Sequence, residues 1–222
     1  MTEKCDDETE QIEEILKHYG IEQAGTKAKK LASYLERLER NRHWGGLTSR
    51  RFKEEAAGAV AGSIAVVEVA GVAGQKRVAD LGAGGGLLGL VLAICCEEWR
   101  VTLVEAASRK ATFLAEAIGA LGIDNARVAN VRAESLLGAE EFDLVVSRAA
   151  GRLKDLAPTA LGLLHKGGQY VALKTSQADE EVADALEVIE ASSGKVVRIK
   201  AITPPPSIKS GARASLVVVE KL

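Results

Sequence analysis

The hydrophobic pattern of the chain changes character near residue 70. Before that point, apolar residues recur every three or four positions over 12–19 and again over 31–38, which is the spacing of one buried helix face. Gly20 and Gly25 separate these two stretches, and an Ala- and Val-rich run follows over 53–73. We therefore predict three helices in the first third of the chain.

Beyond residue 76, short apolar runs alternate with stretches of helical periodicity. The predicted strands are Arg77–Leu81, Val101–Glu105, Arg127–Val131, Phe142–Ser147, Tyr170–Lys174, Val196–Ile202 and Leu216–Val219. The predicted helices are Leu87–Cys96, Arg109–Leu121, Leu153–Leu164 (ended by Gly167-Gly168) and Asp179–Ala191. This alternation favours an α/β fold, in which a mostly parallel sheet carries helices on both faces. We expect residues 71–222 to form this domain and residues 1–70 to form a helical N-terminal extension packed on it.

The composition fits a soluble globular protein, because 47% of the 222 residues are hydrophobic and 27% are charged. No stretch approaches the roughly 20 uncharged apolar residues that a membrane span needs. The first residues are polar and lack the apolar core of a signal peptide. We therefore expect a cytoplasmic protein without a membrane partner. We also expect Cys95 and Cys96 to be buried apolar residues that pack one face of a helix.

The net charge of −2 hides an uneven distribution. Residues 1–14 carry seven acids and one lysine, whereas residues 27–53 carry nine Lys or Arg and two Glu. Basic segments attract phosphate backbones, although the same charges can simply solvate a helix face. The segment 27–53 is thus a candidate contact for nucleic acid.

Four of the predicted strands end in polar or glycine residues. Asp80 precedes the turn Gly82-Ala-Gly-Gly-Gly86, and Glu105 ends the next strand, where a carboxylate can accept hydrogen bonds from both hydroxyls of a ribose. Ala133-Glu134 follows the third strand and is placed to flank an adenine ring, and Ser147-Arg148 ends the fourth. Open α/β sheets bind ligands at the carboxyl ends of their strands, so these residues predict a nucleotide-like cofactor there.

The glycine motif alone is compatible with two classes of cofactor. Gly84, Gly86 and Gly89 match G-x-G-x-x-G, and Glu105 follows at the distance that a dinucleotide fingerprint asks for. A carboxylate at Asp80, however, would repel a pyrophosphate. It would attract S-adenosylmethionine (SAM), which has an α-ammonium and a sulfonium group and no phosphate. Asp80 therefore favours SAM over NAD or FAD.

No nucleophile–base pair and no metal-ligand spacing is evident. His18, His43 and His165 lie away from the predicted strand ends, and the first and last of them fall on or beside predicted helices. Methyl transfer from SAM to an atom that is already nucleophilic needs neither a base nor a metal, since positioning supplies most of the acceleration.

These residues resemble the ribosomal RNA small-subunit methyltransferase G family, also called the glucose-inhibited division protein B family. The resemblance covers residues 30–222. Its pieces are Asp80–Gly89, Val101–Glu105 with Ser108–Leu114, Arg132–Ser135, Phe142–Ala149, Tyr170–Lys174 and Arg213–Lys221, with Leu35–Leu38 and Gly46–Ser49 upstream. It implies the class I SAM-dependent methyltransferase fold, which is Rossmann-like, with a helical N-terminal extension.

The resemblance also implies an activity, namely transfer of a methyl group from SAM to N7 of a guanine in 16S rRNA. Its partner would be 16S rRNA or the small ribosomal subunit, and we expect a monomer without a metal. Together with the strand-end argument it implies cofactor contacts at Asp80, Gly82, Gly84, Leu87, Glu105, Ala133, Glu134 and Arg148. Lys174 and Arg213 fall on family positions that face the RNA or the target base.

The chain departs from the family pattern at three places. Leu87-Leu88 stands where the family usually has Phe-Pro, and Gly46-Leu47-Thr48 stands where it has Asn-Leu-Thr. Ala59-Val-Ala-Gly-Ser63 stands where it often has Arg-His-x-x-Asp-Ser. This last departure keeps open a SAM-dependent methyltransferase for another RNA or a small molecule. A non-catalytic SAM- or RNA-binding protein is a third hypothesis.

Overall fold

The computed structural model describes residues 2–43, 47, 52–174, 177–208 and 214–222. The first part of the chain is helical, as predicted: α1 is Thr2–His18, α2 is Ala24–Arg40, α3 is Phe52–Ile64 and α4 is Val67–Ala70. The single helix that we expected over 53–73 is instead divided into α3 and α4. Ala65 and Val66 form a fully buried turn between the two, and Gly71, at φ +69°, ends the second.

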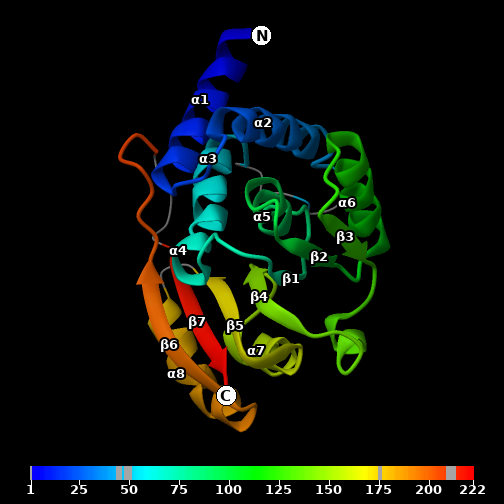
Figure 1. Ribbon diagram of the computed structural model, residues 1–222, viewed down its shortest axis with the longest axis vertical. Helices are drawn as coiled ribbons and strands as arrows, with labels where there is room; N and C mark the ends of the chain where they lie inside the picture. Colours follow the sequence, from blue (N-terminus) through cyan, green and yellow to red (C-terminus); the bar gives the residue numbers. More distant parts are fainter. Residues whose placement is uncertain (1, 44–46, 48–51, 175–176, 209–213) are drawn as a thin grey trace.

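One seven-stranded sheet forms the centre of the molecule (Figure 1). Its strands are β1 (Arg77–Leu81), β2 (Arg100–Val104), β3 (Ala126–Ala129), β4 (Phe142–Arg148), β5 (Leu164–Lys174), β6 (Gly194–Ala201) and β7 (Ser215–Lys221). The spatial order is β3-β2-β1-β4-β5-β7-β6, in which the first five are parallel and β7 runs antiparallel to both of its neighbours. The mostly parallel sheet expected from the sequence is confirmed.

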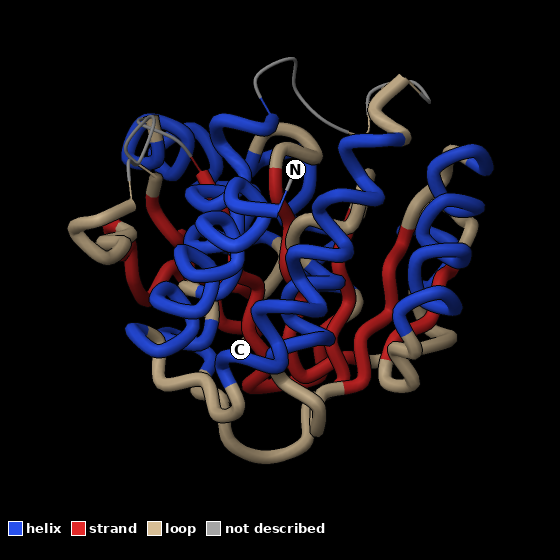
Figure 2. Tube along the Cα trace, turned by 90° about the horizontal axis from the view of Figure 1, so that it is seen from above, coloured by secondary structure: helices blue, strands red, loops and turns tan. Residues whose placement is uncertain are grey.

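Helices cover both faces of the sheet, as the view from above shows (Figure 2). On one face, α5 (Gly89–Cys95) and α6 (Ser108–Leu121) share a hydrophobic core with α1, α2 and α3. On the other face, α7 (Leu153–Gly162) and α8 (Ala178–Ala191) enclose a second core. The N-terminal helices therefore complete the first core, although the domain boundary at residues 70 and 71 stays a prediction.

The segment around residue 164 differs from the sequence prediction. The helix ends at Gly162, and Leu164 already pairs with Phe142 as the start of β5. Gly167, at φ +82°, and Gly168 lie in a register shift inside this strand, so the glycine pair shapes a β-bulge and does not stop a helix. His165 consequently lies at the start of a strand, where its Nε2 is 3.0 Å from Asp143 Oδ1.

No helix in the described part of the chain is long and apolar enough to cross a membrane.

Candidate functional site

The order in which the chain adds strands to the sheet reverses between β1 and β4. From β1 the chain proceeds outward through β2 to β3, then returns to place β4 on the other side of β1. In open α/β sheets, this topological switch point opens a crevice beyond the carboxyl ends of the two strands. Asp80 is the second-last residue of β1, Arg148 is the last residue of β4, and Glu105 directly follows β2, so the predicted residues gather at one edge.

The glycine turn after β1 has backbone angles that only glycine adopts readily. Gly82, Gly84 and Gly86 have φ values of +67°, +59° and +90°. The amides of Gly82 and Ala83 both donate to the Val104 carbonyl, at 2.9 and 3.1 Å, which ties the turn to the end of β2. The turn therefore presents a backbone at the mouth of the crevice that carries no side chain larger than the methyl group of Ala83.

Asp80 is buried, with 1% of its surface exposed, and it anchors the helix that follows the turn. Its Oδ2 accepts a hydrogen bond from the Gly89 amide at 2.8 Å, at the first residue of α5. Burial raises the pKa of Asp80 to about 7, although the Gly89 hydrogen bond and the Arg148 charge act in the opposite direction. A carboxylate with this pKa is stabilised by any cation that enters the crevice.

Glu105 lies beside Asp80 and holds the same turn. Its Oε2 accepts from the Gly84 amide at 2.9 Å and its Oε1 from the Ala107 amide at 2.8 Å. Each carboxylate oxygen has a second lone pair, so these bonds leave acceptor capacity for ribose hydroxyls. Asn130 adds a contact that sequence reasoning missed, because its Nδ2 donates to the Glu105 carbonyl at 2.8 Å and joins the ends of β2 and β3.

Arg148 points from β4 toward the N-terminal helix α3. Its Nη1 donates to the Ala59 carbonyl at 2.8 Å and to Ser63 Oγ at 3.2 Å. The Ser63 hydroxyl is itself 2.6 Å from the Leu87 carbonyl, so one serine links Arg148 to the glycine turn. Burial lowers the pKa of Arg148, whereas the charge of Asp80 opposes this shift. The departure at 59–63 thus falls on a buried stretch that contacts Arg148.

The N-terminal helix α2 closes over the glycine turn from the other side. Tyr34 is fully buried, and its hydroxyl donates to the Gly85 carbonyl at 2.7 Å. A Cβ atom on Gly85 would lie 2.8 Å from both Leu38 Cδ1 and the Leu47 carbonyl oxygen. Sequence reasoning missed Tyr34 because it shares the apolar helical spacing of its neighbours Leu31, Leu35 and Leu38, which predicts nothing beyond packing.

The remaining predicted residues occupy different environments. Leu87 is partly buried against the first core, and Ala133 and Glu134 begin a short 3₁₀ turn, η1 (Ala133–Leu136), in which Glu134 is exposed. Lys174 ends β5 with 8% of its surface exposed and is engaged by its own chain. Arg213 lies outside the described residues.

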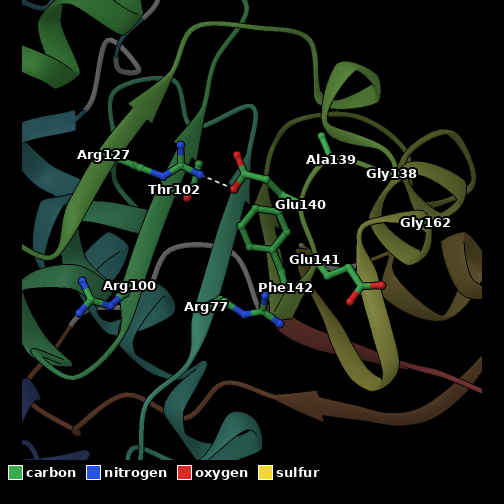
Figure 3. A pocket seen from close by; sticks show the side chains of 10 residues that line it. All are labelled: Arg77, Arg100, Thr102, Arg127, Gly138, Ala139, Glu140, Glu141, Phe142 and Gly162. Atoms are coloured by element: carbon green, nitrogen blue, oxygen red, sulfur yellow. Dashed lines mark hydrogen bonds and ion pairs between the residues drawn. The ribbon is translucent and has the colours of Figure 1, made fainter.

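A hollow of about 560 Å³ lies at the opposite edge of the sheet (Figure 3). Arg77, Arg100 and Phe142, which begin β1, β2 and β4, line it. Arg127 and Glu140 form an ion pair across it. Because α/β sheets bind their ligands at the carboxyl ends of the strands, this hollow is separate from the candidate site.

No group of three or more His, Cys, Asp or Glu side chains is placed to hold a metal ion among the residues that the structure describes.

The fold is that of the class I SAM-dependent methyltransferases. A SAM-dependent O-methyltransferase from Thermotoga maritima superimposes with a TM-score of 0.57 at 13% identity, over 72% of this chain and 64% of that one. The Methanococcus jannaschii fibrillarin pre-rRNA processing protein gives a TM-score of 0.52 at 19% identity, over 68% of each chain.

Residues 27–208 match the model of the rRNA small subunit methyltransferase G family, and the chain belongs to this family. Relatives that carry this name include a protein of Lactobacillus johnsonii, 35% identical over 67% of this chain. Another, from Paenarthrobacter aurescens, is 39% identical over 59% of it. The matched segments span 63% and 60% of those relatives' length.

Tyr34→Phe is expected to weaken the glycine turn without creating a cavity. The Gly85 carbonyl would lose its buried donor, which costs about 1–3 kcal/mol in the free energy of unfolding. Urea denaturation measures this cost, and calorimetry measures the accompanying loss of SAM affinity. Tyr19→Phe is the matched control, because the buried Tyr19 hydroxyl has no hydrogen-bond partner among the described residues. Equal stability of the two variants would contradict the role given to Tyr34.

Proposed function

We propose that this protein transfers a methyl group from SAM to N7 of a guanine in 16S rRNA. The observation that carries the proposal is the grouping at the switch point: a buried Asp80, a turn of positive-φ glycines and Glu105 on the adjacent strand, in a chain of this family. Bound SAM would supply an electrophilic methyl group on a sulfonium centre.

The residues at the crevice fit this cofactor. Asp80 is a buried carboxylate beside a turn whose one side chain is the methyl group of Ala83, so it favours a cationic ligand and repels a phosphate. Glu105 has acceptor capacity for a ribose, and Ala133 and Glu134, which follow β3, would flank the adenine ring. Gly82 and Gly84 would supply backbone contacts to the cofactor, and Leu87 would supply an apolar contact. Arg148, the last residue of β4, would line the side of the crevice formed by that strand.

Guanine N7 suits a site of this kind. This atom has a free lone pair and no proton, so its methylation needs no general base. The carboxylates of Asp80 and Glu105 are both engaged by backbone amides, which leaves them to hold the turn and the cofactor. The methylated ring becomes cationic, and a polar site stabilises that charge.

The basic segment 27–53 gives the proposed rRNA a place to bind. Lys29 of α2 is exposed, and Arg40 and Arg42 lie on the surface in ion pairs with Glu36 and Glu39. Exposed pairs of this kind are weak, so a phosphate can replace the carboxylate partner. By the family resemblance, Lys174 and Arg213 fall on positions that would face the RNA or the target base. We further propose that the protein acts as a monomer in the cytoplasm, where its substrate is found.

The test compares 16S rRNA from a strain that lacks the gene with rRNA from its parent. Mass spectrometry of nuclease fragments should show the loss of one 7-methylguanosine in the deletion strain. A plasmid copy should restore it, and an Asp80→Asn copy should not. An unchanged 7-methylguanosine content would refute the proposed target.

Tritium transfer from labelled SAM separates the other hypotheses. Label in small subunits or free 16S rRNA supports the proposal and identifies the preferred form of the substrate. Label only in another RNA or in a metabolite extract indicates a different target. SAM binding by calorimetry without transfer to any of these would indicate a binding protein.

A further inference from the structure

The loop between β4 and α7, residues 149–152, packs against the glycine turn. A Cβ atom placed on Gly82 would lie 2.9 Å from the Ala150 Cβ. Arg148, immediately before the loop, ends the strand that borders β1 at the switch point. The β4–α7 loop therefore forms the wall of the crevice opposite Glu105, where a small displacement would change the shape of the cofactor site.

This loop holds an unfavourable backbone conformation. Ala149 has φ +52°, in the left-handed region that residues with a Cβ atom rarely adopt. Conformations of this kind persist only where the surrounding structure imposes them. Something outside the loop must therefore hold it.

Two charged side chains from other elements supply this hold. Lys174 Nζ, at the end of β5, donates to the Gly151 carbonyl at 2.8 Å and lies 2.7 Å from Glu181 Oε2 of α8. The same Glu181 oxygen accepts a hydrogen bond from the Leu153 amide at 2.9 Å. The pair thus fixes a carbonyl at the end of the loop and an amide at the start of α7.

This pair is shielded from solvent more than an ordinary surface ion pair. The Lys174 side chain is 8% exposed and that of Glu181 is 30% exposed. Burial alone would raise the pKa of Glu181, but the bonds from Lys174 and the Leu153 amide lower it below its ordinary value. Removing one partner would leave a poorly solvated charge beside the loop.

We propose that Lys174 and Glu181 act as a pair of positioning residues, which set the β4–α7 loop for SAM binding without touching SAM. The proposal rests on the proposed use of SAM. It assigns Lys174 a role through the loop in addition to any contact with the RNA, and it introduces Glu181, which neither the glycine turn nor the strand ends indicated.

The test uses Glu181→Gln, with Asp184→Asn as the matched control. Glutamine keeps the shape of the side chain and an oxygen for the Leu153 amide, but it removes the charge that neutralises Lys174. Asp184 lies on the same helix and pairs with Lys154 of α7 at 2.6 Å, with 56% of its side chain exposed. Its loss removes a more exposed ion pair between the same two helices, one in which neither side chain bonds the backbone carbonyl of Gly151 or the amide of Leu153.

Hydrogen exchange and calorimetry on the full chain give the readout. Glu181→Gln should speed amide exchange over residues 149–153 and weaken SAM binding about tenfold, as expected for loss of a charge-assisted contact. In the methyl-transfer assay, the KM for SAM should rise more than kcat falls. Asp184→Asn should leave exchange in the loop and the SAM Kd unchanged.

Two results would overturn the proposal: a SAM Kd for Glu181→Gln equal to that of Asp184→Asn, or faster exchange throughout the molecule with no excess in the loop. A double-mutant cycle adds a second criterion. Lys174→Met should weaken SAM binding as Glu181→Gln does, and combining the two should add little. Failure of wild-type protein to bind SAM would instead refute the proposed function, and loop exchange would still report whether the pair holds the loop.

Discussion

Asp80→Asn is expected to abolish most SAM binding while making the SAM-free protein more stable above neutral pH. The variant removes the charge that would attract the cationic cofactor, and hydrogen bonds to charged groups are worth about 1.5–3 kcal/mol, or ten- to a hundredfold in Kd. The Gly89 amide retains an acceptor, because asparagine keeps one side-chain oxygen in the place of Asp80 Oδ2. The fold should therefore survive the change.

The gain in stability follows from the pKa of Asp80, which is about 7 in the folded protein and close to 3.8 in the unfolded chain. Between these values the folded protein retains a proton that the unfolded chain has released. The free energy of unfolding therefore falls as the pH rises from about 4 to about 7, and it stays low above 7. Asparagine has no such titration, so its stability curve should be flatter over this range and higher at pH 8.

SAM affinity should show the opposite trend in the wild-type protein. A cation binds the ionised form of Asp80, so the affinity should rise as the pH increases through about 7. Calorimetry at pH 6 and pH 8 measures this change, and urea denaturation at the same values measures stability. Asp143→Asn is the control, since Asp143 lies at the opposite edge of the sheet beside His165. Equal SAM affinity of wild type and Asp80→Asn would rule out the role assigned to Asp80.

The order of elements followed from the sequence because the two hydrophobic periods are distinct. Buried parallel strands contain short continuous apolar runs, such as Leu144–Val146 in β4, whereas α8 repeats its apolar residues at helical spacing. The prediction was wrong where one signal has two meanings. Gly167-Gly168 is typical of a helix stop, but it also suits a β-bulge, and only the pairing of Leu164 with Phe142 decides between them.

The site residues also fall into those that the sequence indicated and those that it did not. Asp80 and Glu105 were accessible from the sequence because an acid at the end of an apolar strand is conspicuous, and parallel strands end at one edge. Tyr34, Ser63 and Glu181 were not accessible, because each reaches the site through a contact with a residue 24 to 51 positions away or through another side chain. Nothing in local periodicity reports such contacts.

Gly89→Ala is expected to damage both the fold and the site, although glycine is not needed there for its backbone angles. Gly89 has no positive φ and begins α5, where alanine is intrinsically preferred. An added Cβ atom, however, would overlap Leu103 Cδ2 and lie 2.7 Å from Asp80 Oδ2. Both neighbours are fully buried strand residues, so neither can move aside without shifting β1 or β2. Overpacking of this kind costs about 1–3 kcal/mol.

Gly119→Ala separates this steric effect from helix propensity. Gly119 lies within α6, and an added Cβ atom would meet no atom within 4 Å. This control should gain up to about 1 kcal/mol in urea denaturation, from helix propensity alone. Gly89→Ala should lose stability and, because α5 must move away from Asp80, should also weaken SAM binding in calorimetry. A Gly89→Ala variant as stable as wild type would mean that β1 and α5 can separate freely. The close approach that places the buried carboxylate under the glycine turn would then not constrain the site.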